Sequence, residues 1–380
     1  MQKEQKETIL KTILDLHSWR EKYNGTDIGL GTDEYNSEIL HYPQAYAVWG
    51  AGYVNLYKST NNEIYLKNAR SCASWLLANP NPRYKGLCWG LPFNWVSNET
   101  NIPICVTTLY CANLFFKLFE LNQDPEMKSI LLSIRKWLIE DNGYIIDLKR
   151  TKGIYFKYAN DPAFSKSVNF CLTAMASGFF SKLHKYEIGD KETNSYFATS
   201  CARFVLKSQQ PNGFWYYDDH LHKIDLIHSA LLLEGLGHFY NYSDFFRDEA
   251  KEGLKSGLNF LANKMIKKDG YSLEIYPSIF ICPWRINDYK WLALYLYNVI
   301  FNRKKLETRV FGYGITIKAL SVCKNIDEQL ATNSANILIR YLTNNHLTEN
   351  NAFRFRPDIP NEYIRDQGHI FDGLTHFLTV

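Results

Sequence analysis

The stretch Gln209-Gln-Pro-Asn-Gly-Phe-Trp-Tyr-Tyr217 decides the fold, because variants of it recur along the chain. Each copy follows an amphipathic helical pattern, places a glycine in a turn, and adds a short aromatic segment before a more apolar helical pattern begins. Four clear copies start about 60 residues apart, and a looser one lies near the end: Gly86, Gly153, Gly213, Gly270 and Ala352. Repetition at a regular spacing predicts pairs of helices that stack side by side.

Apolar residues recur every three to four positions over most of the sequence, which predicts a mainly helical chain. The expected helices are 5–23, 43–59, 62–79, 103–121, 125–140, 166–186, 190–209, 222–240, 244–265, 286–302, 309–323, 326–344 and 364–379. The helices 125–140 and 244–265 carry a charged face, whereas 43–59, 103–121, 166–186 and 222–240 are apolar on most sides. The two kinds alternate along the chain.

This alternation predicts an all-α (α/α)6 toroid, with six inner and six outer helices, formed as a single domain by residues 1–380. An open solenoid is the alternative, but its terminal repeats would need polar caps. The last expected helix, 364–379, instead has the apolar side chains of an inner element. In a toroid, the aromatic connections gather at one end, where the inner helix N-termini add partial positive charge.

The composition fits a globular protein, because 46% of the residues are apolar and 22% are charged. The net charge of +4 comes with scattered lysines, so it favours a small anionic substrate weakly and a nucleic-acid partner hardly at all. We expect a cytoplasmic protein, because the sequence shows neither a secretory signal nor an apolar run of about 20 residues. Nucleotide-binding, hydrolase-elbow and zincin motifs do not occur, and we predict no cofactor.

The aromatic segments supply flat rings with polar edges, on which sugar rings stack. We expect them to form a cup for a sugar, although loop aromatics also plug the ends of helical barrels. Two asparagines are added as donors to sugar hydroxyls or as helix caps. Two arginines are added as clamps for an anionic group or as partners in salt bridges between helices. The predicted substrate-binding residues are Trp89, Asn94, Trp95, Tyr158, Asn169, Trp215, Tyr217, Trp284, Arg285 and Arg365.

Two expected inner helices open with an aspartate and a histidine three residues apart, namely Asp225 with His228 and Asp366 with His369. A carboxylate beside an imidazole holds the ring in one tautomer, so that it can pass a proton near neutrality. We therefore predict Asp225, His228 and Asp366 as catalytic residues. The alternative is that Asp225 caps its helix and His228 is a core histidine. Such pairs can also hold a metal ion, but we predict no metal site.

Several segments resemble the toroid proteins encoded in bacterial extracellular- and capsular-polysaccharide gene clusters, the VpsJ type. The matching segments lie within about residues 84 to 240 and at the start of the last helix: 88–95, 103–108, 168–169, 209–217, 225–236 and 363–365. Asp366 stands where the family pattern has a tryptophan, and the first forty residues have no counterpart.

This resemblance implies an (α/α) toroid related in architecture to glycoside hydrolases and to uronate-acting lyases and epimerases. It also implies a relation to terpene-cyclase toroids, whose structural repeats carry a Gln…Gly-x-Trp motif like Gln209…Gly213-Phe-Trp215. The resemblance gives a pathway context, polysaccharide biosynthesis, rather than a reaction.

The sequence therefore leads to the hypothesis of a carbohydrate-active enzyme that processes a bacterial surface polysaccharide or its precursor, as a hydrolase, a lyase or a uronate epimerase. The alternative is a non-catalytic glycan-binding or assembly component. A terpene-type cyclase is less favoured because D-x-D-D is missing, and a lanthionine-type cyclase because a Cys-His zinc set is missing. The expected partners are an oligosaccharide or polysaccharide, with an anionic one as a candidate, and no nucleic acid. The membrane-bound polysaccharide machinery is a candidate transient partner.

Overall fold

The computed structural model of the chain describes residues 3–95, 99–164, 168–218, 222–277, 288–301 and 306–380. Thirteen α-helices occur in these ranges, and their bounds lie within a few residues of the helices predicted from apolar spacing. The α-helices are α1 Lys3–Asn24, α2 Pro43–Thr60, α3 Glu63–Ala78, α4 Cys105–Asn122, α5 Pro125–Lys136, α6 Phe170–Lys185, α7 Lys191–Lys207, α8 Leu226–Tyr242, α9 Arg247–Phe260, α10 Asp288–Phe301, α11 Val310–Val322, α12 Glu328–Asn345 and α13 Ile364–Thr379.

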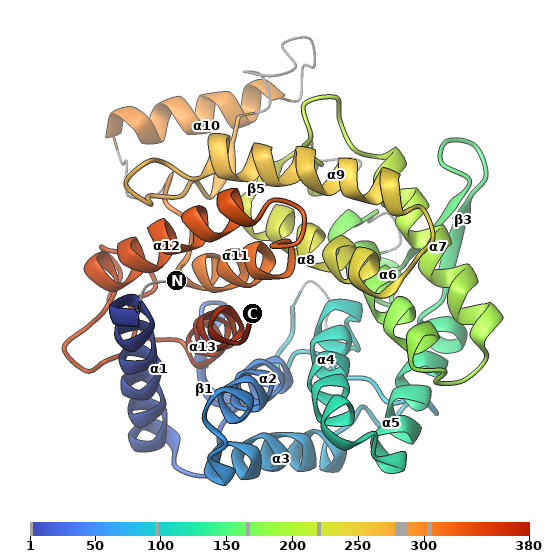
Figure 1. Cartoon of the computed structure of the whole chain (residues 1–380), viewed down its shortest axis with the longest axis horizontal. Helices are drawn as coiled ribbons and strands as arrows, with labels where there is room; N and C mark the ends of the chain where they lie inside the picture. Colours follow the sequence, from blue (N-terminus) through green and yellow to red (C-terminus); the bar gives the residue numbers. More distant parts are fainter. Residues whose placement is uncertain (1–2, 96–98, 165–167, 219–221, 278–287, 302–305) are drawn as a thin grey trace.

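The helices form two concentric rings (Figure 1). The inner ring consists of α2, α4, α6, α8, α11 and α13, and the outer ring of α1, α3, α5, α7, α9 and α12. The last inner helix, α13, packs against the first, α2, so the ring is closed. This closure confirms the predicted (α/α)6 toroid and excludes the open solenoid. Helix α10 is an extra element that lies outside both rings.

Short antiparallel ribbons and turns decorate the connections between the rings. The strands are β1 Leu30–Asp33, β2 Asn36–His41, β3 Tyr144–Asp147, β4 Gly153–Phe156, β5 Ile224–Asp225 and β6 Ile275–Tyr276, paired as β1–β2, β3–β4 and β5–β6. Two π-helical turns, Trp137–Asn142 and Leu261–Met265, continue α5 and α9, and a 3-10 turn spans Pro162–Phe164. These ribbons all lie in segments that run from an outer helix to the next inner one.

The repeated glycines let each of these connections dock on the following outer helix. A Cβ atom at Gly153 would lie 2.6 Å from the backbone nitrogen of Phe204 in α7. Gly86 approaches the π-helical end of α5 in the same way. Gly213 and Gly270 approach α9 and α12, and they also adopt φ values of +86° and +97°, which other residues rarely tolerate. The glycine repeat is therefore explained by packing between neighbouring repeats.

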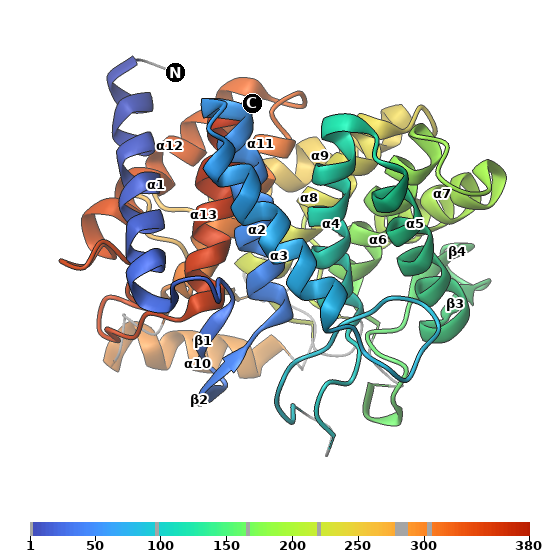
Figure 2. The same ribbon diagram turned by 90° about the horizontal axis from the view of Figure 1, so that it is seen from below.

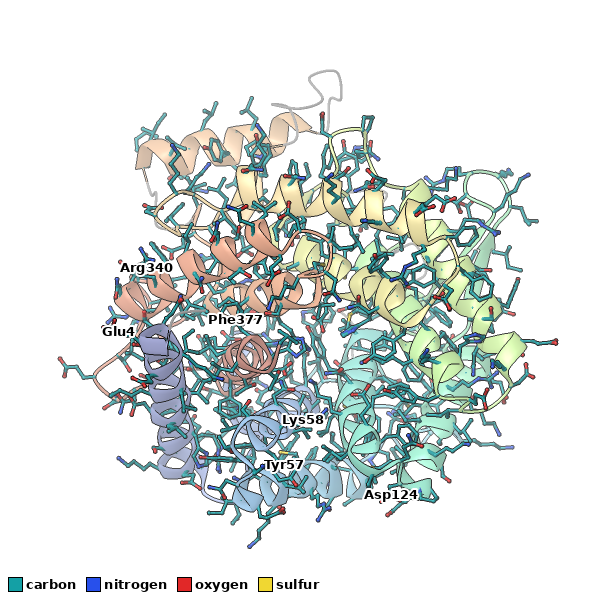
Figure 3. All side chains as sticks on the ribbon, viewed as in Figure 1. Glu4, Tyr57, Lys58, Asp124, Arg340 and Phe377 are labelled. Atoms are coloured by element: carbon teal, nitrogen blue, oxygen red, sulfur yellow. The ribbon has the colours of Figure 1, made fainter. Side chains whose placement is uncertain are left out.

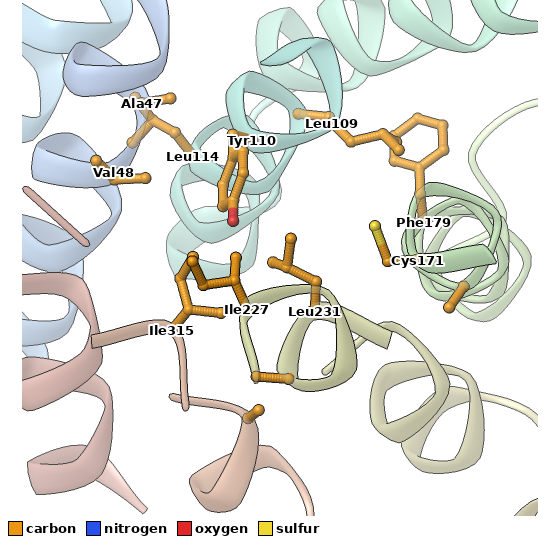
Figure 4. Close-up of a cluster of buried hydrophobic side chains, with 14 of the residues drawn as sticks. Ala47, Val48, Leu109, Tyr110, Leu114, Cys171, Phe179, Ile227, Leu231 and Ile315 are labelled. Carbon is orange, nitrogen blue, oxygen red and sulfur yellow. The ribbon is translucent and has the colours of Figure 1, made fainter. Parts of the chain in front are cut away.

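A cluster of apolar side chains lies in the centre of the inner ring. Figure 4 shows residues from five inner helices converging there: Ala47, Val48, Leu109, Tyr110, Leu114, Cys171, Phe179, Ile227, Leu231 and Ile315. Figure 3 shows side chains occupying the space between the two rings, with Lys58 of α2 and Phe377 of α13 towards the carboxyl ends of these inner helices. The opposite end, where the inner helices begin, carries β1, β2 and the long connections (Figure 2). We call this end the mouth.

Candidate active site

The pair Asp225 and His228 lies at the mouth, at the N-terminus of the inner helix α8. Asp225 is the N-cap residue, and its Oδ1 accepts a 2.8 Å hydrogen bond from the backbone nitrogen of His228. The same carboxylate holds the imidazole, since His228 Nδ1 lies 2.7 Å from Oδ1 and 2.8 Å from Oδ2. One side chain thus caps the helix and orients the ring.

The two side chains differ in exposure. The side chain of Asp225 is 1% exposed, whereas that of His228 is 26% exposed. Burial by itself would raise the pKa of Asp225, but His228 and the Lys223 ammonium, 3.1 Å from Oδ2, lower it well below its usual value. The carboxylate therefore stays ionised and accepts from Nδ1, which leaves Nε2 to take up or release a proton.

A tyrosine packs against this histidine. The rings of Tyr217 and His228 meet edge to face, with their centroids 4.2 Å apart. Burial, above all, raises the pKa of Tyr217, and the nearby Asp225 carboxylate adds to the effect. The hydroxyl is therefore protonated at neutral pH and can donate a hydrogen bond. Asn169 caps α6 by accepting from the backbone of Leu172 at 3.2 Å, and its side chain also lies near the Tyr217 hydroxyl.

Aromatic rings from three connections form a second wall of the mouth. The ring of Trp95 lies 5.9 Å from those of Tyr158 and Phe164 and 6.2 Å from that of Tyr35, measured between centroids. Tyr35 is 49% exposed, and Trp95 and Tyr158 are half-buried. Asn94, next to Trp95 in sequence, is exposed. Partly exposed rings of this kind offer flat faces and polar edges to a sugar.

The pair and the aromatic wall belong to one region. Burial raises the pKa of Tyr158, and Tyr217, Tyr35 and Arg365 also act on this hydroxyl electrostatically. The connections that precede α2, α6 and α8 therefore meet the first turn of α13 at the mouth. Of the predicted site residues, Trp95, Tyr158, Asn169, Tyr217, Asp225, His228 and Arg365 come together here.

The arginine predicted as an anion clamp is already paired within the protein. Arg365 Nε lies 3.1 Å from Asp33 Oδ2, and its Nη2 lies 3.0 Å from Glu34 Oε1. Arg309 extends the network, with Nη1 at 2.8 Å from Glu34 and Nη2 at 3.0 Å from Glu274. The contacts of Arg365 therefore support the interpretation that it forms salt bridges. Arg365 and Arg309 both bind carboxylates of the protein itself.

This network includes residues that the sequence reasoning missed. Glu34 and Tyr35 form the turn between β1 and β2, and the Tyr35 hydroxyl accepts a 3.0 Å hydrogen bond from Arg309. Arg309 stands at the start of an expected inner helix, so the rule that selected Arg365 would also have found it. The β1–β2 hairpin had no comparable signal, because its short strands lack a clear alternating pattern.

The second pair, Asp366 and His369, does not form an acid–base unit. Asp366 is fully buried, and neither carboxylate oxygen has a hydrogen-bond partner within the described ranges. Burial raises the pKa of Asp366 well above its usual value, despite the neighbouring Arg365, whose Nη2 lies 3.8 Å from Oδ1. His369 is 3% exposed, and its Nε2 is engaged by the side-chain amide of Gln44 at 3.0 Å. The structure buries Asp366, and its predicted catalytic role stays a prediction.

Two tryptophans that were predicted to contact a sugar are buried instead. Trp89 is 0% exposed and Trp215 is 3% exposed, so neither can offer a face to a sugar. Each indole donates to a backbone oxygen near the end of the preceding outer helix, Leu76 at 3.0 Å and Val205 at 2.9 Å. Each of these carbonyls also accepts from the C-cap backbone nitrogen of its helix, Asn79 at 3.2 Å and Ser208 at 3.1 Å. The repeated tryptophan therefore fastens a connection to its outer helix.

Two further predicted residues, Trp284 and Arg285, lie outside the described residues. Within the described ranges, no group of three or more His, Cys, Asp or Glu side chains is arranged to hold a metal ion. Nor is any helix of those ranges sufficiently long and apolar to traverse a bilayer.

No protein-family model and no curated protein matches the sequence. Solved structures do match it. A family 88 glycosyl hydrolase from Bacteroides vulgatus has a TM-score of 0.63 at 11% identity, covering 98% of this chain and 99% of that one. The GH76 α-mannanase from Bacteroides thetaiotaomicron has a TM-score of 0.68 at 10% identity, with coverages of 98% and 95%. The cellobiose 2-epimerase from Bacillus thermoamylovorans has a TM-score of 0.62 at 10% identity, with coverages of 94% and 98%. At such identities the likeness establishes the fold, and the chain shares the (α/α)6 toroid of these proteins.

Proposed function

We propose that the protein is a carbohydrate-active enzyme in which His228 transfers a proton to or from a carbon atom of a bound sugar. Asp225 orients the imidazole. Tyr217 is the residue placed to donate a hydrogen bond to an oxygen of the substrate, and Trp95 and Tyr158 offer the faces on which a sugar ring stacks. Proton transfer of this kind is the common step of epimerisation and β-elimination.

This proposal rests on the contact of both Asp225 carboxylate oxygens with His228 Nδ1, combined with the partial exposure of the histidine. A histidine that only filled the core would be buried, as is His369, which is 3% exposed and has its Nε2 3.0 Å from the Gln44 amide. The names of the similar structures, two glycoside hydrolases and a sugar epimerase, support a carbohydrate substrate.

Hydrolysis by two carboxylates has less support. It requires two acid groups that face each other across the scissile bond, about 5–10 Å apart. At the described part of the mouth, Asp33, Glu34 and Glu274 are held by arginines, and Asp225 is held by His228 and Lys223. A mechanism centred on the histidine therefore uses the groups that are best placed.

A neutral sugar suits the mouth better than a uronate. Arg309 and Arg365 both have their guanidinium groups occupied by Glu34 and other carboxylates of the chain. An anionic substrate would have to displace these short contacts. We therefore propose a neutral sugar unit whose reacting carbon lies next to a carbonyl group, since such a carbon has an acidic proton.

A second candidate function is glycan binding without catalysis. It is favoured by the burial of Asp366 and His369, which leaves a single acid–base pair at the mouth among the described residues. Binding would use the same aromatic wall and would not need the ionised Asp225.

The test is incubation of the purified protein in D2O with a panel of neutral and uronic-acid oligosaccharides. Deuterium at a sugar carbon, measured by NMR, would report epimerase chemistry, and absorbance of an unsaturated uronate would report a lyase. New reducing ends without deuterium would contradict the proposed proton transfer and favour a hydrolase. Binding of a sugar without any of the three signals would favour the second candidate.

The cellular setting is part of the proposal. The resemblance of residues 84–240 to toroid proteins of the VpsJ type suggests work on a bacterial surface polysaccharide or its precursor. We propose that this takes place in the cytoplasm, next to the membrane-bound machinery that assembles such polymers.

A further inference from the structure

A cavity lies inside the inner ring, between α4, α6 and α8. Its volume is about 40 Å³, and a single water needs about 10–15 Å³, so the cavity has room for a ligand of a few heavy atoms. Glu234, the first residue of α8 that lines it, lies about 9 Å further along the helix than His228. The cavity is therefore separate from the candidate active site. Its walls are largely apolar (Figure 4 labels two of these residues): Leu109, Phe116, Met175 and Phe179.

Two glycines let α6 and α8 cross closely beside this cavity. A Cβ atom at Gly178 would lie 2.8 Å from the Cβ of His238. A Cβ atom at Gly235 would lie 2.3 Å from the backbone of Ala174. Lys182 is one helical turn beyond Gly178, so it extends from the face of α6 that turns towards α8. This placement makes Lys182 part of the cavity wall.

The ammonium group of Lys182 lacks a partner of opposite charge. The residue is 6% exposed and, within the described ranges, makes neither a hydrogen bond nor an ion pair. Its Nζ instead faces the rings of Phe116 and Tyr242, 5.5 Å and 5.2 Å from their centroids. Burial lowers the pKa of Lys182, because a buried charge without a partner costs free energy. An anion in the cavity would offset this cost.

The carboxylates at this end of the ring are bound to other groups. Lys318 Nζ lies 2.8 Å from Glu234 Oε1 and 2.8 Å from Asp372 Oδ2. Glu120 accepts hydrogen bonds from two tyrosine hydroxyls, at 3.2 Å and 3.1 Å, and lies 3.9 Å from the Lys58 ammonium. No carboxylate of the described chain is therefore left to pair with Lys182.

The charges of the inner helices at this end leave one positive charge in excess. Burial, above all, lowers the pKa values of His238 and His376 well below the usual value, so both imidazoles are neutral. Such an excess favours a singly charged anion over a neutral ligand or a zwitterion. Leaving aside the exposed Lys185, four lysines stand against three carboxylates: Lys58, Lys117, Lys182 and Lys318 against Glu120, Glu234 and Asp372.

We propose that this cavity binds a small carboxylate that also carries a hydroxyl group. The ligand carboxylate accepts a charge-assisted hydrogen bond from Lys182. Glu234 Oε2 is buried without a hydrogen-bond partner within the described ranges, so it can accept from the ligand hydroxyl. The apolar walls cover the carbon atoms between these two groups.

The experiment is a titration of the full-length protein, followed by ligand-observed NMR. Glycolate is compared with acetate, which lacks the hydroxyl, and with glycolamide, which lacks the charge. We expect saturable binding of glycolate, binding of acetate that is weaker by about tenfold, and no saturation by glycolamide at the same concentrations. Lys182→Met is expected to weaken the binding of glycolate by about ten- to a hundredfold, because it removes the charged donor.

The matched control is Lys117→Met. This change removes another buried lysine of the same end, one that does not line the cavity and whose Nζ donates to Asn55 Oδ1 at 2.6 Å. The control is expected to bind glycolate with nearly the wild-type affinity, and circular dichroism checks the fold of both variants.

The proposal is overturned if glycolate shows no saturable binding to the wild type, or if acetate or glycolamide binds as tightly. It is also overturned if Lys117→Met weakens binding as much as Lys182→Met. The comparison of the three ligands uses the wild type alone, so it decides the matter even where a variant fails to fold. Because the titration measures no catalysis, its result is independent of the function proposed for the mouth.

Discussion

The two Asp-x-x-His pairs have the same spacing and lie near the starts of two inner helices, yet they occupy opposite environments. Asp225 is ionised and holds His228, whose side chain is 26% exposed. Asp366 is buried and has a raised pKa, and His369 is 3% exposed and contacts Gln44 instead. A shared motif therefore does not imply a shared role.

The difference follows from where each aspartate lies relative to its helix start. Asp225 precedes α8 as the N-cap, where a side chain can turn back to the backbone and to the residue three positions on. Helix α13 begins at Ile364, so Asp366 is already in its first turn and points into the ring of helices. The position of the helix start, shifted by a few residues, thus decides whether the aspartate contacts the histidine of its motif or is buried between the helices.

The largest expected effect is a difference in activity between variants of the two histidines. His228→Gln is expected to reduce the rate of proton exchange into the sugar by roughly a hundred- to ten-thousand-fold, because it removes the general acid–base group. The matched change His369→Gln is expected to retain most of the rate. Initial rates of deuterium incorporation measure both. Equal losses in the two variants would refute the distinction between the pairs.

The second prediction concerns stability, for which we expect the change at His369 to have the larger effect. His369→Ala is expected to lower the free energy of unfolding by about 1–3 kcal/mol, because it leaves the Gln44 amide without its buried partner. His228→Ala changes a side chain that is partly exposed and is expected to cost less. Urea denaturation of both variants provides the comparison. A larger loss for His228→Ala would mean that His228 is the structural member.

The third prediction concerns pH. The folded pKa of Asp225 is lowered, so its contribution to stability is present above the unfolded pKa of about 4 and is lost as the pH falls below it. The folded pKa of Asp366 is raised, so stability present below about pH 4 is lost as the pH rises. Asp225→Asn should therefore be less stable than wild type near neutral pH, and this difference should shrink in acid. The stability of Asp366→Asn relative to wild type should instead increase as the pH rises. Thermal unfolding between pH 3 and 8 tests both slopes, and slopes of the same sign would contradict the assignment.

The smallest expected effect separates the two roles of Asp225. Asparagine keeps a capping oxygen for the backbone of His228, whereas alanine does not. Asp225→Ala is therefore expected to be about 1 kcal/mol less stable than Asp225→Asn, while both lose the proton-transfer activity. Urea denaturation measures the difference between the two variants. Equal stabilities would indicate that the hydrogen bond to the backbone contributes nothing.

The sequence predicts the helices and their closure into a ring well, because burial imposes an apolar period on every inner helix. It also identifies Asp225 with His228, since both roles of the aspartate depend on residues three positions apart. The contacts of the tryptophan side chains could not be predicted. Whether Trp89 faces a sugar or donates to Leu76 depends on how a connection folds back on its outer helix, which local pattern does not encode.

The arginine network escaped prediction for a different reason. Arg365 is paired with Asp33 and Glu34, which lie more than 300 positions earlier in the chain. Such a contact exists only because the last inner helix packs beside the first, so it follows from ring closure and not from any local motif. Sequence reasoning found the cation at the mouth but had no access to the carboxylates that occupy it.

The most direct test of the account is a crystal structure of the His228→Gln variant with a bound oligosaccharide. The account predicts a sugar ring between Trp95 and Tyr217, with its reacting carbon within about 3.5 Å of the position that His228 Nε2 occupies in the wild type. A sugar bound away from residue 228, or one whose nearest ionisable groups are two opposed carboxylates, would contradict it.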